Sequence, residues 1–141
     1  MSTRPIRVLA LGCFDCLHIG HVKHLQAARA LGDELIVALT ADPSVKKGPG
    51  RPVFSWKERF DHLYALKCVD GVYVVSNWRK AIELIHPDIY VKGIEYEGNL
   101  PEQNMIEEYG GRVVFLDTKP RYSSTLILTG QLFNERRKEN E

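Results

Sequence analysis

Uninterrupted apolar runs alternate along the chain with stretches whose apolar residues recur at helical spacing. Such continuous runs are typical of strands that are buried on both faces of a parallel sheet. The alternation therefore predicts one α/β domain over residues 1–141, built on a Rossmann-like sheet of five parallel strands with helices on both faces. The predicted strands are 6–11, 34–39, 69–75, 88–93 and 112–116.

Residues that begin and end helices stand at the expected places between these runs. Ser55 and Glu58 form a capping box ahead of the second helix, and Asn77 caps the next one. Gly32 is predicted to end the first helix in a left-handed conformation. The charged tail from about residue 134 is expected to fray.

Composition limits the possible function classes. The chain has 141 residues, of which 44% are hydrophobic, and 19 basic residues nearly balance 18 acidic ones. A balanced charge provides no overall field that would attract nucleic acid or an anionic membrane. The first residues lack the apolar core of a signal peptide, and no run approaches the roughly 18 apolar residues of a membrane span. We therefore expect a cytoplasmic protein without a nucleic-acid or membrane partner.

Three cysteines, Cys13, Cys16 and Cys68, are too few for a disulfide framework and fit a reducing compartment. Cys13 and Cys16 have the C-x-x-C spacing of redox and zinc sites, but no second ligand pair stands at zinc spacing elsewhere in the chain. Packing beneath a loop is the favoured interpretation of this pair, and no metal site is predicted.

The segment from Gly12 to His21, GCFDCLHIGH, joins the first strand to the first helix. A glycine turn followed by a helix start aims backbone N–H groups and the positive helix end at an anion. His18 and His21, three residues apart, face the same way and can both donate hydrogen bonds to phosphoryl oxygens. The segment therefore predicts phosphate chemistry. His24 continues the spacing but lacks partners for a metal, and we assign it to packing or to the surface.

Residues 40–52 form the one long irregular segment, which carries Lys46, Lys47 and Arg51 among glycines and prolines. Loops of this length are typically lids or binding loops, and three cations there can bind a triphosphate. No apolar side chain is available to hold the segment still without a ligand, so we expect a lid that closes over bound NTP. A solvated charged loop is the alternative.

Further residues suited to phosphate binding follow this loop. Arg59, near the first turn of the second helix, opposes the helix dipole and therefore needs an anion. Lys92 stands at the end of the fourth strand, where open parallel sheets bind ligands. Ser123, Ser124 and Thr125 begin a last helix with hydroxyls that can cap it or contact a phosphate.

The segment GCFDCLHIGH resembles the G-x-F-D-x-x-H-x-G-H signature of the cytidylyltransferase-like nucleotidyltransferases. The resemblance continues through the lysine-rich loop, the helix with Arg59, the run VKGIEY and the serine-threonine segment. Within this family the chain is similar to glycerol-3-phosphate-type cytidylyltransferases and to adenylyltransferases of the ADP-heptose type. The resemblance implies transfer of a nucleotidyl group from ATP or CTP to a phosphorylated sugar or polyol, with release of pyrophosphate. The ADP-heptose type is the preferred interpretation.

The resemblance also implies roles for individual residues. The predicted catalytic residues, which would hold and neutralise the reacting phosphates, are His18, His21, Lys46 and Arg59. Lys47 and Arg51 are predicted to bind substrate, and Mg²⁺ is expected to bridge oxygens of the NTP. The predicted nucleotide-binding residues are Gly12, Cys13, Phe14, Asp15, Gly20, Lys92, Gly93, Glu95, Ser123, Ser124 and Thr125.

For some of these residues the sequence leaves two roles open. Asp15 binds a cation or orders its loop through backbone hydrogen bonds. Lys92 and Glu95 contact the acceptor and the nucleotide, or they are solvated charges at the end of a strand. Related cytidylyltransferases carry an arginine-threonine pair where this chain has Thr118 and Lys119. Either Arg121 substitutes for the arginine, or the chain follows the heptose-type relatives, which also lack it.

A competing function class is a non-catalytic nucleotide-binding module on the same fold. Such a module would keep the glycines but would not need both histidines together with Lys46 and Arg59, so an enzyme is preferred. We also expect a homodimer, because relatives of this size dimerise and a small open sheet leaves edges to cover.

Overall fold

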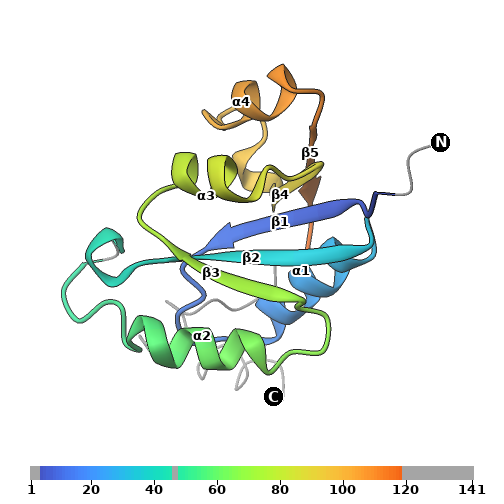
Figure 1. The fold of residues 1–141 in the computed structure, drawn as a ribbon. Helices are drawn as coiled ribbons and strands as arrows, with labels where there is room; N and C mark the ends of the chain where they lie inside the picture. The colour runs from blue at the N-terminus through green and yellow to red at the C-terminus, as the bar shows by residue number, and fades with distance from the viewer. Residues whose placement is uncertain (1–3, 46–47, 119–141) are drawn as a thin grey trace, which may run out of the picture.

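Five parallel strands form one sheet in the computed structural model, which describes residues 4–45 and 48–118. The strands are β1 (Arg7–Gly12), β2 (Glu34–Thr40), β3 (Gly71–Val75), β4 (Ile89–Gly93) and β5 (Arg112–Leu116). Their order in the sheet is β3-β2-β1-β4-β5, so the chain starts in the middle and adds strands on either side (Figure 1). This order confirms the predicted Rossmann-like fold.

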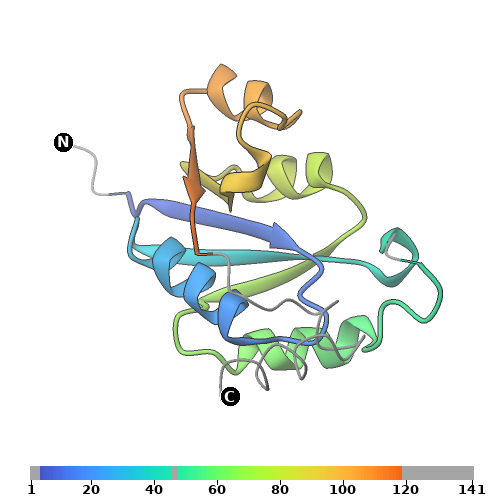
Figure 2. The ribbon, with the colours of Figure 1, turned by 180° about the vertical axis from the view of Figure 1, so that it is seen from behind.

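Helices cover both faces of the sheet, as predicted. The segments between the strands form α1 (Ile19–Arg29), η1 (Asp42–Ser44), α2 (Trp56–Tyr64), α3 (Trp78–Ile85), η2 (Ile94–Tyr96) and α4 (Gln103–Glu108). α1 and α2 lie on one face, and α3 and α4 lie on the other (Figures 1 and 2). None of the helices in the described part of the chain is long and apolar enough to cross a membrane.

Alternate side chains of a strand pack against different helix layers, because successive residues point to opposite faces. On β1, Val8 and Ala10 are fully buried on the side of α1 and α2, where they join Leu25 and Leu63. Leu9, which stands between them, is fully buried on the side of α3 and α4. Burial on both faces explains why the strand is a continuous apolar run.

Ser55 and Asn77 cap the starts of α2 and α3, as the sequence predicts, but the predicted capping box is only half formed, because Glu58 contacts the Ser55 hydroxyl and not its backbone N–H. Ser55 Oγ accepts a hydrogen bond from the backbone N–H of Glu58 at 3.3 Å and donates to the Glu58 carboxylate, also at 3.3 Å. Asn77 Oδ1 accepts from the backbone N–H of Lys80 at 2.9 Å. Each cap satisfies a backbone donor that has no partner within the helix. The cap at Ser55 thereby fixes the position of Arg59 on α2.

Gly32 does not end α1 in a left-handed conformation, so that prediction is wrong. The helix ends at the C-cap Ala30, which is right-handed with φ of −69°, and the φ of Gly32 is not positive. A Cβ added to Gly32 would lie 2.8 Å from the carbonyl oxygen of Ile6 and 2.8 Å from Val8 Cγ2. Glycine is needed because the turn after α1 passes directly against the start of β1.

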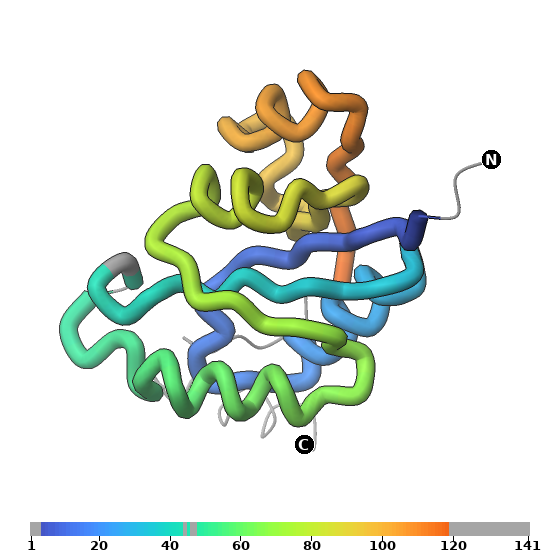
Figure 3. Tube along the Cα trace, viewed as in Figure 1, coloured from blue at the N-terminus to red at the C-terminus, as the bar shows by residue number. Residues whose placement is uncertain are grey.

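The carboxyl ends of β1, β2 and β4 meet at one edge of the sheet. The parallel register sets Gly12 beside Leu39, and the Thr40 hydroxyl donates to the Gly12 carbonyl oxygen at 3.2 Å. The segment between β2 and α2 extends beyond this edge before it turns back to α2 (Figure 3). Open parallel sheets bind ligands at such an edge, so the segments that leave it are the candidates for a site.

Candidate functional site

A cleft of about 300 Å³ lies between the loop after β1, the start of α1 and the segment that follows β4. The first part of the chain lines it with Gly12, Cys13, Phe14, His18, Gly20 and His21. The later part lines it with Lys92, Gly93 and Glu95. All of these residues were predicted to belong to the site, so the fold brings the two predicted segments together.

His18 and His21 cap α1 through a reciprocal pair of hydrogen bonds. His18 is the N-cap residue, and its Nδ1 accepts from the backbone N–H of Gly20 at 3.1 Å. The Nδ1 of His21 accepts from the backbone N–H of His18, also at 3.1 Å. The two rings are stacked, with centroids 3.9 Å apart and planes inclined by 27°. Both imidazoles are therefore held at the N-terminus of the helix.

These hydrogen bonds determine which ring nitrogen donates to a ligand. A nitrogen that accepts a hydrogen bond carries no proton, so each imidazole bears its proton on Nε2. Two Nε2–H groups thus belong to the first turn of α1, beside the positive end of the helix dipole. Two N–H donors and the positive end of a helix dipole both attract the negatively charged oxygens of a phosphate.

The loop between β1 and α1 has a constrained backbone. Phe14 and Cys16 have positive φ values of 51° and 54°, which residues other than glycine rarely adopt. A Cβ on Gly12 would meet the Phe14 ring at 3.0 Å, so a larger residue there would push against this ring. Phe14 is buried, and its ring packs edge-on against the His21 ring at a centroid distance of 5.6 Å. The His21 ring is therefore in contact both with the loop, through Phe14, and with His18.

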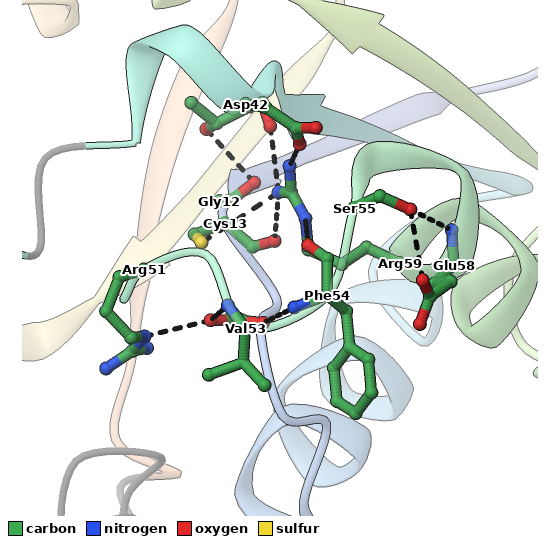
Figure 4. Close-up of polar contacts among 11 residues, drawn as sticks. Gly12, Cys13, Asp42, Arg51, Val53, Phe54, Ser55, Glu58 and Arg59 are labelled. Carbon is green, nitrogen blue, oxygen red and sulfur yellow. Dashed lines mark hydrogen bonds and ion pairs between the residues drawn. The ribbon is translucent and has the colours of Figure 1, made fainter. Parts of the chain in front are cut away.

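Asp15 joins two loops, which favours the second of its two predicted roles. Its carboxylate accepts hydrogen bonds from the backbone N–H groups of Val53 at 2.7 Å and Phe54 at 3.0 Å, and from Arg51 Nε at 2.9 Å (Figure 4). Burial by itself would raise the pKa of Asp15, but these donors outweigh it and lower the pKa below its usual value. The ionised carboxylate fastens the loop after β1 to the segment before α2.

The Arg59 guanidinium is fully buried and holds the same two segments (Figure 4). Its Nη1 donates to the carbonyl oxygens of Cys13 at 2.9 Å and Thr40 at 2.8 Å, and its Nε donates to that of Phe54 at 3.0 Å. Its Nη2 pairs with the Asp42 carboxylate. The anion that sequence reasoning required is therefore supplied by the protein. A contact with the leaving pyrophosphate stays a prediction.

The segment 40–52 is anchored near both ends, which corrects the expectation that nothing holds it still. Asp42 begins η1 and is paired with Arg59. Toward the other end, the Arg51 side chain is only 10% exposed and is paired with the fully buried carboxylate of Asp15. Ion pairs hold the segment, whereas the sequence analysis considered only apolar contacts.

Several predicted site residues lie outside the part of the chain that the structure describes, and their roles stay predictions. They are Lys46, Lys47, Ser123, Ser124 and Thr125. Arg121, the candidate substitute for the family's arginine, lies there too.

Lys92 brings a half-buried cation to the cleft. Its Nζ lies 3.4 Å from the carbonyl oxygen of Leu11 and 4.8 Å from the centroid of the Tyr96 ring. Burial lowers the pKa of Lys92, although the carboxylates of Glu102 and Glu95 oppose this effect. An anionic group that enters the cleft would offset this desolvation, so Lys92 is placed to attract a phosphate.

The cleft also contains residues that the sequence analysis did not assign to it. They are Leu11, His24, Tyr96, Leu116 and Thr118. Tyr96 belongs to the same short run as Lys92, so its place could have been inferred from the run itself. His24 repeats the three-residue spacing of the other two histidines, and this spacing was the available signal for its face of α1.

No group of three or more His, Cys, Asp or Glu side chains within 4–45 and 48–118 is arranged to hold a metal ion. Cys13 and Cys68 are free thiols. Burial raises the pKa of the Cys16 thiol, and the Asp15 carboxylate raises it further. A raised pKa disfavours the thiolate that redox chemistry needs, so packing stays the favoured interpretation of the C-x-x-C pair.

Comparison with known families gives one match that covers most of the chain. The model of the family described as cytidylyltransferase-like matches residues 9–130. The matched range begins within β1 and includes the loop after β1, the start of α1 and the segment after β4. Every residue named above as lining the cleft lies inside this range.

Individual relatives agree with this match. The bifunctional protein HldE of Syntrophotalea carbinolica is 44% identical over 129 residues, and the match covers 86% of this chain and 26% of that protein. HldE of Streptomyces coelicolor is 46% identical over 126 residues, with 86% and 27% covered. The chain thus spans about a quarter of the length of these relatives. A solved structure, the lipopolysaccharide core biosynthesis protein of Thermoplasma volcanium, has a TM-score of 0.68 and 30% identity, covering 85% of this chain and 100% of that one.

Proposed function

This chain belongs to the cytidylyltransferase-like family, and on that premise we propose that it is a nucleotidyltransferase that acts on a phosphorylated sugar. An oxygen of the acceptor phosphate attacks the α-phosphorus of an NTP and forms a new P–O–P linkage. The bond from the α-phosphorus to the oxygen that bridges to the β-phosphorus breaks, and pyrophosphate leaves with the electron pair. The acceptor phosphate is ionised at neutral pH, so the reaction depends on positioning and charge neutralisation.

The observation that carries this proposal is the reciprocal cap formed by His18 and His21. Because both Nδ1 atoms accept backbone hydrogen bonds, each of the two stacked rings carries its proton on Nε2 before any ligand binds. Negative charge grows on the phosphoryl oxygens as pyrophosphate departs, and preorganised donors stabilise that charge without rearranging. Serine or asparagine would cap a helix equally well, so capping alone does not account for two histidines.

Other residues complete the proposed phosphate site. Lys92, which lines the same cleft, binds a phosphate oxygen, and Lys46 neutralises the triphosphate. Ser124 and Thr125 contact the β and γ phosphates. Mg²⁺ is proposed to arrive with the NTP, where it would neutralise the phosphate oxygens. Its ligands on that view come from the NTP, because three protein donors already engage the Asp15 carboxylate.

A sugar phosphate is the preferred acceptor, with ATP or CTP as the nucleotide. Two HldE proteins are 44% and 46% identical to this chain, and the run VKGIEY resembles adenylyltransferases of the ADP-heptose type. Glycerol 3-phosphate with CTP is the second candidate. It is favoured by Asn77-Trp78 and Glu97-Gly98, which resemble the glycerol-3-phosphate type.

Pyrophosphate release tests the proposal. The protein is incubated with Mg²⁺ and either ATP or CTP, together with heptose 1-phosphate, mannose 1-phosphate or glycerol 3-phosphate. We expect release that requires a sugar phosphate and one of the two nucleotides. Release only with CTP and glycerol 3-phosphate would support the second candidate. Tight NTP binding without release from any pair would overturn the enzyme proposal in favour of a non-catalytic nucleotide-binding module.

We also propose that the protein is a cytoplasmic homodimer. β3 is at one end of the strand order, and no described strand pairs with its outer edge, where Tyr73 and Val74 are exposed. An exposed apolar edge strand favours association with another chain. Free thiols at Cys13 and Cys68 fit a reducing compartment. Light scattering that finds only a 16.1 kDa species at micromolar concentration would contradict the dimer.

A further inference from the structure

His24 lies in the same cleft as His18 and His21, farther along α1. Its Nδ1 is 3.5 Å from the hydroxyl oxygen of Thr118, just after β5. The rise of an α-helix places His24 about 4.5 Å beyond His21 along the axis. That distance is comparable to the step from a phosphate to the sugar ring that carries it. A ligand whose phosphate meets the first two histidines is therefore long enough for its sugar to reach the third.

The imidazole of His24 is neutral at neutral pH. Burial lowers its pKa, and the Lys92 ammonium lowers it further, while the Glu95 carboxylate opposes both effects. A neutral imidazole has one N–H donor and one acceptor, and it adds no positive charge to the cleft. It is therefore better matched to a hydroxyl group, which both donates and accepts, than to an ionised phosphate, which only accepts.

Glu95 also lines the cleft, and its carboxylate is close enough to His24 to act on the pKa of that imidazole. Its side chain folds back over Gly93, where an added Cβ would lie 2.6 Å from the Glu95 Cδ. A carboxylate repels a phosphate but accepts hydrogen bonds from hydroxyl groups, as acidic residues do for the ribose in many dinucleotide-binding sheets. Beside His24, Glu95 thus provides a hydroxyl-binding carboxylate that the pair of His18 and His21 lacks.

We propose that His24, Glu95 and Thr118 form a subsite that recognises hydroxyl groups of a sugar ring. The proposal rests on the proposed nucleotidyl transfer and extends it, because it separates sugar recognition from phosphate binding within one cleft. Two sources supply such hydroxyls in that reaction, the ribose of the NTP and the sugar of the acceptor. The experiment therefore has one arm for each source.

In the first arm, calorimetry measures the binding of ATP and CTP and of their 2′-deoxy and 3′-deoxy counterparts. If ribose occupies the subsite, the wild-type protein binds a ribonucleotide about tenfold more tightly than its deoxy counterpart. His24→Leu, which fills a similar volume without hydrogen bonds, then binds the two alike. Lys23→Ala alters an exposed neighbour on α1 and should keep the wild-type ratio.

In the second arm, mannose 1-phosphate is compared with 2-deoxyglucose 1-phosphate, which lacks only the 2-hydroxyl. If the acceptor sugar occupies the subsite, the preference and its loss in His24→Leu appear in this arm. Gly93→Ala, which displaces Glu95, should weaken the same preference in the same arm. A His24→Leu protein that keeps the wild-type ratio in both arms overturns the proposal, as does a wild-type protein without a preference in either.

Binding ratios do not depend on turnover. A lost preference in His24→Leu therefore supports the subsite even if no pyrophosphate is released, and pyrophosphate release with unchanged ratios supports the reaction without the subsite. The failure of one proposal is thus distinguishable from the failure of the other.

Discussion

The His21 imidazole accepts a hydrogen bond from the backbone of His18, while the His18 imidazole caps the same turn of α1 through Gly20. The contacts that cap the helix also set the tautomer of both rings, so the pair serves structure and proposed chemistry at once. A test of the chemistry must therefore keep the cap.

His18→Asn should separate the two roles of that residue. Asparagine is a good N-cap, so the free energy of unfolding should stay within about 1 kcal/mol of the wild-type value. Loss of the Nε2 donor should lower kcat by about a hundredfold or more. Urea unfolding and steady-state kinetics measure the two effects, with Lys23→Ala as the control. Near-normal turnover in His18→Asn would remove this histidine from the reaction.

Arg59→Ala should destabilise the fold. The substitution leaves buried carbonyl oxygens and the Asp42 carboxylate without their donor, at a cost of about 3 kcal/mol in the free energy of unfolding. Arg4 is a matched control, because its side chain is 64% exposed in the ion pair with Asp88, and Arg4→Ala should destabilise the fold much less than Arg59→Ala. Chemical denaturation compares the variants. Equal stability of the two, with activity lost only in Arg59→Ala, would place this guanidinium on the ligand instead.

His24 should make the fold sensitive to acid. Its pKa in the folded protein lies below the ordinary value of 6.5, so the unfolded chain binds this proton more readily. As the pH falls through about 6.5, protonation therefore favours unfolding, and stability declines. Lys92 strengthens this effect and Glu95 weakens it. In melting curves between about pH 7.5 and about pH 5.5, His24→Gln should lose less stability than the wild type. Parallel pH profiles of the two proteins would show that His24 titrates as an ordinary surface histidine.

Residues 43–50 should gain protection from hydrogen exchange when Mg²⁺-NTP binds. The pairs of Asp42 with Arg59 and of Arg51 with Asp15 fix the ends of this segment, so closure over the triphosphate is expected between them. Lys46→Ala should weaken both NTP binding and turnover, and Lys47→Ala should do less. Protection that saturating Mg²⁺-NTP leaves unchanged would mean that the segment is not a lid.

The sheet was predictable because each buried strand is a short apolar run with a recognisable helix start or turn nearby. Leu9 and its neighbours on β1 illustrate this. Because the strand is buried on both faces, no polar residue interrupts its apolar run. Gly32 was not predictable in the same way. Its constraint is the approach of Ile6, which is distant in the sequence, and a glycine after a helix is more often a left-handed cap.

The site was predictable where one short segment contains both the turn and the side chains that form it, as from Gly12 to His21. It was not predictable where the tertiary structure supplies the partner. The position of Arg59 near the start of α2 indicated that its positive charge needs an anion. It did not indicate that Asp42 provides this anion. The spacing of His24 indicated its face of α1, but only the sheet shows that Lys92 and Glu95 share its cleft.

Phosphorus NMR of the complete reaction tests the central claim most directly. With Mg²⁺, the active NTP and its sugar phosphate, we predict that the triphosphate signals give way to the paired signals of a diphosphate-linked sugar nucleotide, with pyrophosphate in equal amount. Unchanged triphosphate signals, or the appearance of orthophosphate alone, would contradict nucleotidyl transfer.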